Sequence, residues 1–335
     1  SLDLTLADLL PEGWDFQKSD RSWLSTTELK GKTASNVTVA QLPIQSMKYP
    51  TEMSMTYGGT GTLIVNVKGT GAVTFQWYKV EDGNEKAVGS ETTKNQFDLA
   101  AQNLSAGQHT FRFSATCNGY KKMSQDIVVT VQKADIRSGL ITPPTAQENL
   151  TYTGQAQALI TAGSVTSGGT MQYSLTENGT YSQDIPVGTD AGAYTVWYRV
   201  IGDANHNDTA PASVAVSIGK KPLTITGVTA ASKPYDGTTN AGITSVTFDN
   251  VTLNRGTDYT VAASFDDAGV GNGKSITATV TLMDQAEKNY ALEQSSFTTT
   301  GSITKAAAPD FIRETALVII NGYEKTYTVT LPALP

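Results

Sequence analysis

The amino-acid sequence predicts an all-β protein made of tandem immunoglobulin-like β-sandwich modules. Three observations support this fold class. Apolar and polar residues alternate with a period of two, and helical periodicity is nearly absent. Asn or Asp before Gly, which tolerates the positive φ of tight turns, separates the alternating runs. A Tyr-x-Gly turn recurs three times along the chain, at a spacing that suits one small sandwich domain.

The composition is that of a globular, acidic chain. Its 335 residues suffice for about two or three domains, and hydrophobic residues make up 39% of them. The net charge is -7 at pH 7. No basic stripe is present to displace counterions, so a nucleic-acid partner is not expected. Cys117 is the single cysteine, which excludes an intrachain disulfide. No apolar run is long enough for a membrane span.

The repeats divide the chain into modules. The Tyr-x-Gly turns begin at Tyr57, Tyr152 and Tyr235, 95 and 83 residues apart. Each is followed by alternating strands and by a last apolar alternation that ends in Lys, at positions 133, 220 and 305. The predicted domains are an N-terminal segment at 1–44, modules at 45–134, 135–221 and 222–306, and a C-terminal segment at 307–335.

The N-terminal segment is interpreted as the tail of a preceding module. It includes a possible helical turn at residues 5–11 and a strand at 36–39. In the first module, residues 61–67 alternate as a strand, and residues 75–80 form a central strand that carries the core Trp77. Tight turns are predicted at four sites, at residues 82–83, 118–119, 178–179 and 272–273.

The second module has the spacing of a tyrosine corner at residues 190–194, Asp-Ala-Gly-Ala-Tyr. Two residues later Val196 stands where an antibody domain has its second Cys, so an apolar core is expected there. The matching stretch of the first module is residues 105–109, where His109 replaces the Tyr. In the third module it is residues 267–269, Asp-Ala-Gly, so the corner is degenerate.

The third module and the C-terminal segment continue the β pattern. Residues 275–282 alternate as a strand. The preceding residues 269–274, Gly-Val-Gly-Asn-Gly-Lys, have the composition of a phosphate loop, but a phosphate loop requires a helix next and a strand pattern follows instead. A hairpin turn is therefore predicted at residues 269–274. Residues 316–320 and 327–331 are expected to be the first two strands of a further, truncated module.

Two stretches resemble repeats of bacterial surface proteins. Residues 222–306, with Lys-Pro-Tyr-Asp-Gly-Thr-Thr at 233–239, resemble the YDG repeat. Residues 135–221 resemble a neighbouring bacterial Ig-like repeat of the MBG type. The resemblance implies a secreted or cell-wall-anchored array of adhesive spacers in an extracellular setting. It implies no catalytic residues.

Few side chains are candidates for a chemical role. A hydrolytic nucleophile usually needs a His base, and the two histidines, His109 and His206, lack such a partner in the sequence. His109 is expected to be structural and His206 to lie on the surface. Cys117 is interpreted as a half-buried small hydrophobe. Residues 203–208, Asp-Ala-Asn-His-Asn-Asp, resemble half of a calcium loop, but the turn Gly and the bidentate Glu are missing, so an Asx-rich turn is favoured.

The acidic pairs at residues 81–82 and 266–267 suggest solvated turns more than paired catalytic carboxylates. No catalytic, cofactor-binding or metal-binding residue is assigned, and no enzymatic activity is predicted. Lys48, Lys68 and Lys274 are candidate protectors of edge strands.

The leading functional hypothesis is a non-catalytic extracellular stalk or adhesion scaffold. The alternative is a module that binds a glycan or an extracellular-matrix protein through exposed aromatic residues, for which the candidates are Trp14, Trp23, Tyr120 and Tyr181. Core packing is the competing explanation for aromatic residues, and strand alternation places Trp77 and Trp197 inwards.

Overall fold

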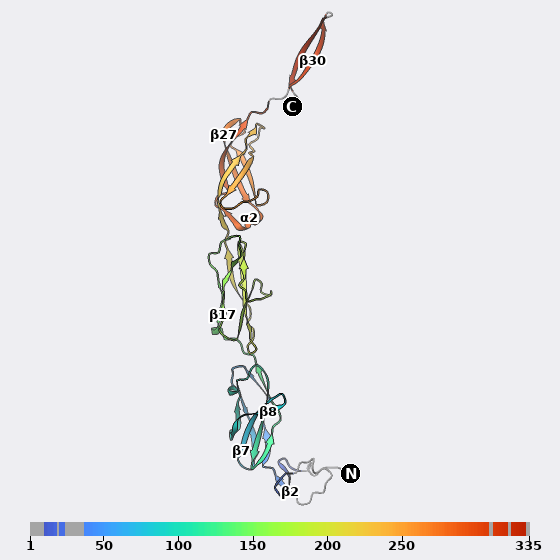
Figure 1. The fold of residues 1–335 in the computed structure, drawn as a ribbon, viewed down its shortest axis with the longest axis vertical. Helices are drawn as coiled ribbons and strands as arrows, with labels where there is room; N and C mark the ends of the chain where they lie inside the picture. The colour runs from blue at the N-terminus through green and yellow to red at the C-terminus, as the bar shows by residue number, and fades with distance from the viewer. Residues whose placement is uncertain (1–9, 19, 24–36, 308–310, 321–322, 333–335) are drawn as a thin grey trace. The chain divides into compact units, whose positions relative to one another are not determined.

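A computed structural model describes residues 10–18, 20–23, 37–307, 311–320 and 323–332. Strands make up most of these ranges, which confirms the all-β, tandem immunoglobulin-like fold class (Figure 1). Contacts divide the chain into two compact units. Unit 1 contains residues 1–145, 162–184 and 197–213, and unit 2 contains residues 146–161, 185–196 and 214–335. The second module is shared between the two units.

The first module lies in unit 1 and is a sandwich. Its larger sheet has the order β4-β12-β10-β7-β8, with β11 beside β10, and two smaller pairs, β3-β6 and β5-β9, complete it. The β4-β12 pair is parallel and the others are antiparallel. The strands are β3 (Ile44–Lys48), β4 (Glu52–Thr56), β5 (Thr62–Ile64), β6 (Asn66–Gly69), β7 (Val73–Glu81), β8 (Asn84–Thr92), β9 (Gln96–Asp98), β10 (Gly107–Cys117), β11 (Tyr120–Met123) and β12 (Ile127–Gln132).

Two of the predicted tight turns close hairpins of this sheet. Asp82 and Gly83 have φ values of 50° and 78° between β7 and β8, and Asn118 and Gly119 have 48° and 79° between β10 and β11. A two-residue turn with positive φ at both central residues matches the twist of the strands that it joins. Asn and Gly or Asp and Gly adopt it at little steric cost.

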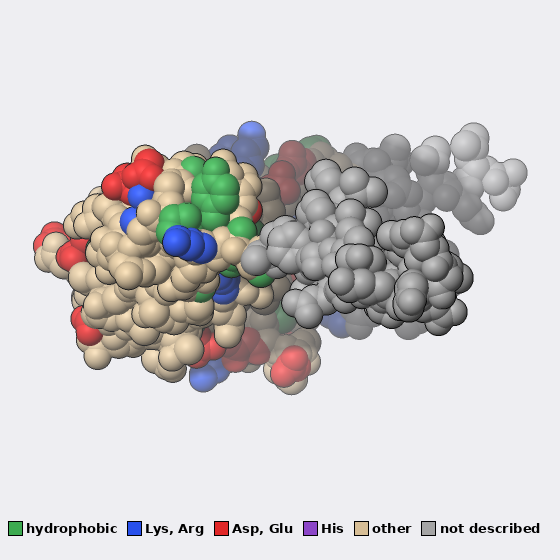
Figure 2. Space-filling model, turned by 90° about the horizontal axis from the view of Figure 1, so that it is seen from above, with side chains coloured by type: hydrophobic (Ala, Val, Ile, Leu, Met, Phe, Trp, Pro, Cys, Tyr) green, Lys and Arg blue, Asp and Glu red, His purple; other side chains and the backbone are tan. Residues whose placement is uncertain are grey.

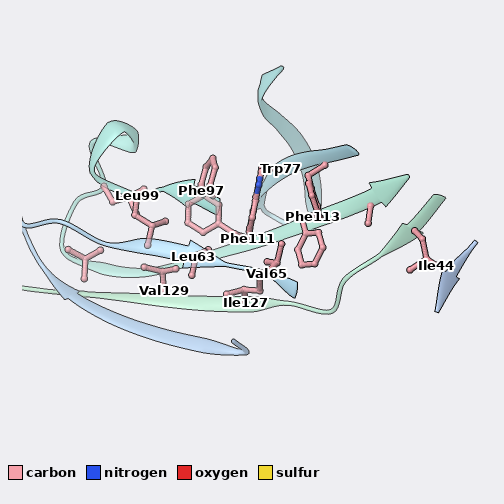
Figure 3. Close-up of a cluster of buried hydrophobic side chains, with 14 of the residues drawn as sticks. Ile44, Leu63, Val65, Trp77, Phe97, Leu99, Phe111, Phe113, Ile127 and Val129 are labelled. Carbon is pink, nitrogen blue, oxygen red and sulfur yellow. The ribbon is translucent and has the colours of Figure 1, made fainter. Parts of the chain in front are cut away.

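The core of the first module combines aromatic and aliphatic side chains (Figure 3). Trp77 is 2% exposed and stacks on Phe97 with 4.7 Å between ring centroids. Phe111 and Phe113, two residues apart on β10, are fully buried because alternate residues of a strand share one face. Cys117 at the end of β10 is 1% exposed, so it is a core residue and more deeply buried than predicted.

The second module contributes β13 (Ile141–Thr142), β17 (Ser164–Val165) and β18 (Gly169–Ser174) to unit 1, and β15 (Gln157–Ala158) and β19 (Val187–Gly188) to unit 2. Its longest strand, β20 (Gly192–Gly202), belongs to the sheet β18-β20-β21, in which β21 spans Ala212–Ile218. A further pair of short strands is formed by β14 (Thr145–Ala146) and β16 (Ile160–Thr161). Residues 178–179 lie in a turn, as predicted.

One inward residue of β20 was predicted correctly and another was not. Val196 is fully buried, so an apolar residue does replace the second cysteine of an antibody domain. Trp197 is only half-buried, which contradicts its predicted core position. Val196 and Val200 are the buried residues of this strand, and an odd-numbered neighbour therefore faces the other way.

The third module lies in unit 2. Its main sheet has the order β24-β29-β27-β26, and the pairs β23-β25 and β22-β28 accompany it. Two groups of buried side chains fill it, one around Leu223 and Tyr259 and the other around Phe265 and Ile276. The elements are β22 (Lys221–Leu223), β23 (Ile225–Ala230), β24 (Lys233–Pro234), β25 (Ile243–Phe248), β26 (Tyr259–Phe265), β27 (Gly271–Leu282), the short helix α2 (Asp284–Asn289), β28 (Tyr290–Leu292) and β29 (Ser296–Thr304).

The predicted hairpin turn at residues 272–273 is wrong. These residues form a bulge inside β27, where the register with β29 passes from the pair Gly271 and Ile303 to the pair Lys274 and Gly301. Gly273 has φ +61°, so Asn-Gly supplies the left-handed residue of a bulge here. The turn between β26 and β27 lies earlier, at residues 266–270. Lys274 is consequently in an inner strand, and its predicted role at a sheet edge is also wrong.

The two ends carry short strand pairs. Near the N-terminus β1 (Trp14–Lys18) pairs with β2 (Val37–Gln41), and near the C-terminus β30 (Phe311–Ile320) pairs with β31 (Tyr323–Pro332). The two strands predicted at residues 316–320 and 327–331 are thus present. The helical turn predicted at residues 5–11 falls mostly outside the described residues.

Candidate functional site

Two loops with the same residue pattern, acidic-x-Asn-aromatic, form the most regular feature of this protein. Junction loop 1 is residues 203–206, Asp-Ala-Asn-His, in unit 1. The segment called junction loop 2 is residues 287–290, Glu-Lys-Asn-Tyr, in unit 2, and it consists of the last turn of α2 and the first residue of β28. Each belongs to one module and contacts the module before it in the chain. The surface that receives each loop is called a socket below, and it consists of the same three parts in both cases.

The first part of a socket is a backbone N–H at the corner that precedes a long strand. The Ala106 N–H donates to Asn205 Oδ1 at 2.8 Å, and the Ala191 N–H donates to Asn289 Oδ1, also at 2.8 Å. The partners are 99 and 98 residues apart in the chain. Asn289 is 2% exposed, so this buried amide depends on protein partners for its hydrogen bonds.

The second part is the Tyr of the Tyr-x-Gly turn. Tyr57 packs on His206 and Tyr152 packs on Tyr290, in both cases with 5.4 Å between ring centroids and 79° between ring planes. Edge-to-face contact of this kind is favoured by the quadrupoles of the rings. The repeated Tyr is thus explained by a packing contact at each junction.

The third part is the Lys that follows the last strand of the module. Lys133 Nζ donates to the Asp203 carbonyl at 3.2 Å, and Lys220 Nζ donates to the Glu287 carbonyl at 2.5 Å. The residue after each Lys makes a parallel β contact with the aromatic residue of the loop. These contacts pair Ala134 with His206 and Lys221 with Tyr290.

Charged groups add to both junctions. Lys288 Nζ lies 2.7 Å from Asp190 Oδ2, and its hydrogen bond, with that of Asn289, lowers the pKa of Asp190. The same ion pair raises the pKa of Lys288. At the first junction His206 Nδ1 lies 2.7 Å from Asp203 Oδ1, and this contact lowers the pKa of the Asp203 carboxyl.

The corners that supply the socket N–H groups are stabilised by side-chain hydrogen bonds to the backbone. The Tyr194 hydroxyl donates to the Asp190 carbonyl at 2.7 Å, which confirms the tyrosine corner. His109 Nε2 lies 2.8 Å from the Ser105 carbonyl, the same four-residue step back along the chain. A carbonyl only accepts hydrogen bonds, so Nε2 of His109 carries the proton. His109 is therefore structural, as expected.

Two aspartates of residues 203–208, the stretch that resembles half of a calcium loop, accept backbone hydrogen bonds, and the Asp203 contact is an Asx turn. Asp203 Oδ1 accepts from the Asn205 N–H and Asp208 Oδ1 accepts from the Gly202 N–H, each at 2.8 Å. The predicted surface position of His206 is wrong, because its side chain is 20% exposed and packs on Tyr57. Across the described ranges, no group of three or more His, Cys, Asp or Glu side chains is placed to hold a metal ion.

The Lys-Pro-Tyr-Asp-Gly-Thr sequence of the third module forms a turn around a lysine. Lys233 Nζ donates to Asp236 Oδ1 and to the Thr238 carbonyl, both at 2.7 Å. Asp236 also accepts from the N–H and hydroxyl of Thr238, each at 2.9 Å. The Lys233 ammonium, followed by these Thr238 donors, lowers the pKa of Asp236 to about 2. The turn is a local ionic structure.

The acidic residues of the predicted turns form ion pairs with neighbouring lysines. Lys274 lies 2.6 Å from Asp267, and Lys79 lies 2.7 Å from Glu81. Each contact lowers the pKa of the carboxyl. Lys48 and Lys68 lie in the two-stranded pair β3-β6, where a role at a sheet edge fits the topology.

The aromatic residues proposed for glycan stacking are mostly engaged. Trp23 packs edge-on against Tyr120 at 6.0 Å, and the guanidinium of Arg199 covers the Tyr181 ring at 4.3 Å. Trp14 is the exposed member of the set, at 40%. Binding of a glycan or a matrix protein stays a prediction, because the described residues do not place several of these exposed aromatic side chains together.

The sequence indicated parts of the junctions without connecting them, and it did not single out residues 287–290. Tyr57, Tyr152 and the closing lysines were recognised as repeats, and residues 203–208 as an unusual loop, but their contact across about a hundred residues was not foreseen. A usable signal was present in the shared acidic-x-Asn-aromatic pattern of residues 203–206 and 287–290. No helix within the described parts is long and apolar enough to cross a membrane.

Comparison with known proteins adds one family match. A model described as the YDG domain matches residues 219–299, which confirms the YDG character predicted for the third module. The MBG-type resemblance of residues 135–221 stays a prediction. No curated protein matches the chain.

Two solved structures illustrate the distant likeness to immunoglobulin-domain proteins. Extracellular domains 3–5 of Drosophila OTK are similar at 10% identity, with a TM-score of 0.25, over 80% of this chain and 99% of that one. The N-terminal four Ig domains of Dscam1 isoform 6.44 are similar at 10% identity, with a TM-score of 0.23, over 89% of this chain and 92% of that one.

Proposed function

We propose that this chain is a non-catalytic scaffold that acts as a stalk, with repeated junctions that restrict motion between consecutive modules. The observation that carries the proposal is the repetition of one contact set. At both junctions a corner N–H, a Tyr ring and a Lys ammonium receive the same three positions of an acidic-x-Asn-aromatic loop. A spacer needs its joints restrained, and hydrogen bonds and packing at each joint supply that restraint.

The surroundings of the histidines support a scaffold over an enzyme. The His109 ring hydrogen-bonds to the Ser105 carbonyl. The His206 ring hydrogen-bonds to Asp203 and packs on the Tyr57 ring. Both side chains therefore have structural partners instead of a nucleophile to activate.

We also propose that the chain works outside the cell, anchored to or secreted from a bacterium. The resemblance of its repeats to those of bacterial surface proteins supports this setting, and the match of residues 219–299 to the YDG domain agrees with that resemblance. Protease treatment of intact cells of the source organism, followed by immunoblotting, tests it. Cleavage without cell lysis is expected, whereas full protection would contradict the setting.

The restraint itself is tested by ¹⁵N relaxation on the whole chain. Amides of Phe113, in the first module, and Val200, in the second, both lie in unit 1 and are expected to share one rotational correlation time. The double substitution Asn205→Ala with Tyr57→Ala removes two of the three socket contacts, so two different correlation times are expected. Asn66→Ala, at an exposed position of β6, is the matched control, and in this variant the two modules should still share one correlation time. A single shared value in the double variant would contradict the stalk proposal.

A further inference from the structure

The third module has the parts of a socket as well. Its Tyr-x-Gly residue, Tyr235, donates its N–H to the Thr304 carbonyl at 2.8 Å. The same bond runs from Tyr57 to the Gln132 carbonyl at 2.8 Å and from Tyr152 to the Gly219 carbonyl at 2.9 Å. Each carbonyl belongs to the residue just before the Lys of the socket, which in the third module is Lys305.

The corner N–H of this third socket is identified by strand register. In the first module Gly107 pairs with Val131, two residues before Lys133. In the third module Gly271 pairs with Ile303, two residues before Lys305. Val270, which precedes Gly271, therefore occupies the place of Ala106. The sequence had suggested residues 267–269 for this corner, because their Asp-Ala-Gly repeats the pattern of residues 190–192, whereas the strand register places the corner at Val270.

These parts are open to solvent. Tyr235 is 48% exposed and Val270 is 50% exposed, whereas Tyr57 and Tyr152 are half-buried and Ala191 is 5% exposed. Among the described residues, no backbone hydrogen bond is formed by the Val270 N–H. Exposed apolar side chains are scarce on the face in Figure 2, where they gather beside Lys and Arg side chains. Lys305 is exposed as well, so all three residues of the third socket are accessible.

We propose that Tyr235, the Val270 N–H and Lys305 form a docking surface for the acidic-x-Asn-aromatic loop of a further Ig-like module joined after Lys305. The two occupied sockets define this occupant, since each holds such a loop from the module that follows its Lys. A second copy of the chain is a poorer occupant, because its own loops at 203–206 and 287–290 are already bound within it. The inference rests on the proposed junction role and extends it to a surface that no junction loop of the described residues occupies.

The test is an extended chain in which a second copy of residues 221–305 follows Lys305 directly. Asn289 and Tyr290 of the copy then stand where they do after Lys220. Exchange of the Val270 amide, followed by NMR, is expected to slow about tenfold or more relative to the parent chain, because one hydrogen bond of about 1.4 kcal/mol closes it. Asn289→Ala in the copy alone should restore fast exchange. Asn240→Ala in the copy, at an exposed position, is the matched control.

A second extended chain carries residues 134–220 after Lys305, so that failure of one duplicated module to fold does not leave the question open. Its loop supplies Asn205 and His206 in place of Asn289 and Tyr290. Fast exchange at Val270 in both extended chains would overturn the proposal. That result would leave the junctions at Ala106 and Ala191 untouched, and their relaxation test would still decide the stalk function separately.

Discussion

Asn289 uses both ends of its amide at the second junction. Its Oδ1 accepts from the Ala191 N–H, and its Nδ2 lies 3.2 Å from Asp190 Oδ1. Asn289→Ala leaves the buried Ala191 N–H without a partner, so the free energy of unfolding of unit 2 should fall by about 1–3 kcal/mol. Urea unfolding measures this, with Asn240→Ala as the control. A loss below about 0.5 kcal/mol would show that water replaces the side chain.

Substitutions of His109 test whether the hydrogen bond to the carbonyl four residues back stabilises the corner, whichever residue type makes it. Because Tyr194 makes the same bond in the second module, His109→Tyr should place a hydroxyl on the Ser105 carbonyl and keep the stability near that of the parent chain. His109→Phe keeps the ring but loses the donor, so unfolding of the first module should become easier by about 1 kcal/mol. Thermal unfolding of the two variants compares them. Equal midpoints would refute a role for this hydrogen bond.

Asp236 makes the stability of the third module depend on pH in the acidic range. Its pKa is lowered from 3.8 to about 2, so the carboxylate stabilises the folded state above the unfolded value and loses this effect as the pH falls towards 2. Asp236→Asn should therefore be less stable than the parent near neutral pH, and the difference should shrink across that acidic range. Urea unfolding at several pH values measures it. A difference that does not change with pH would point to a lost turn instead of a lost charge.

At the scale of elements, junction loop 1 depends on the close approach of its chain to the end of β20. A Cβ on Gly202 would overlap the carbonyl oxygens of His206 and Asn207. Gly202→Ala should displace the loop and weaken the contact of His206 with Tyr57. Ring-current shifts of the His206 and Tyr57 protons in NMR spectra report that contact. Gly139→Ala, which meets no atom within 4 Å, is the control, and unchanged shifts in the Gly202 variant would contradict this account.

Elements also show where sequence reasoning ends. The turns at 82–83 and 118–119 were predictable because both φ values are set by the local residues. The same Asn-Gly pair at 272–273 became a bulge, since the pairing of β27 with β29 decides its role. Trp197 was misplaced for a related reason: alternation fixes which residues share a face, but burial of Val196 and Val200 decides which face is inside.

At the scale of the molecule, the cores of different modules are separate clusters of residues. Phe111 is fully buried in the first module, and Ile276 is fully buried in the third. Phe111→Ala should lower the stability of the first module by about 3–5 kcal/mol and leave exchange of the Ile276 amide unchanged. Hydrogen exchange measured by NMR follows both. Faster exchange at Ile276 would reveal coupling that the separate cores do not predict.

The fold class and the Tyr-x-Gly repeat could be predicted because they rest on periodicity and local turn chemistry. The sockets could not, because Asn205 and Ala106 meet only once the modules are folded, and neither residue type signals a contact alone. The corner at Val270 was hidden for a third reason: the Asp-Ala-Gly pattern of the second module's corner recurs at residues 267–269, but strand pairing places the corner of the third module at Val270.

The socket and the loop are different surfaces, which has a consequence for how such chains lengthen. A contact between unlike surfaces is heterologous, and it has no symmetry that closes it on itself. Each added module that brings both a loop and a socket uses one free surface and supplies another. Gain or loss of a whole module therefore preserves the joints on either side, and the length of the array can change without any new interface.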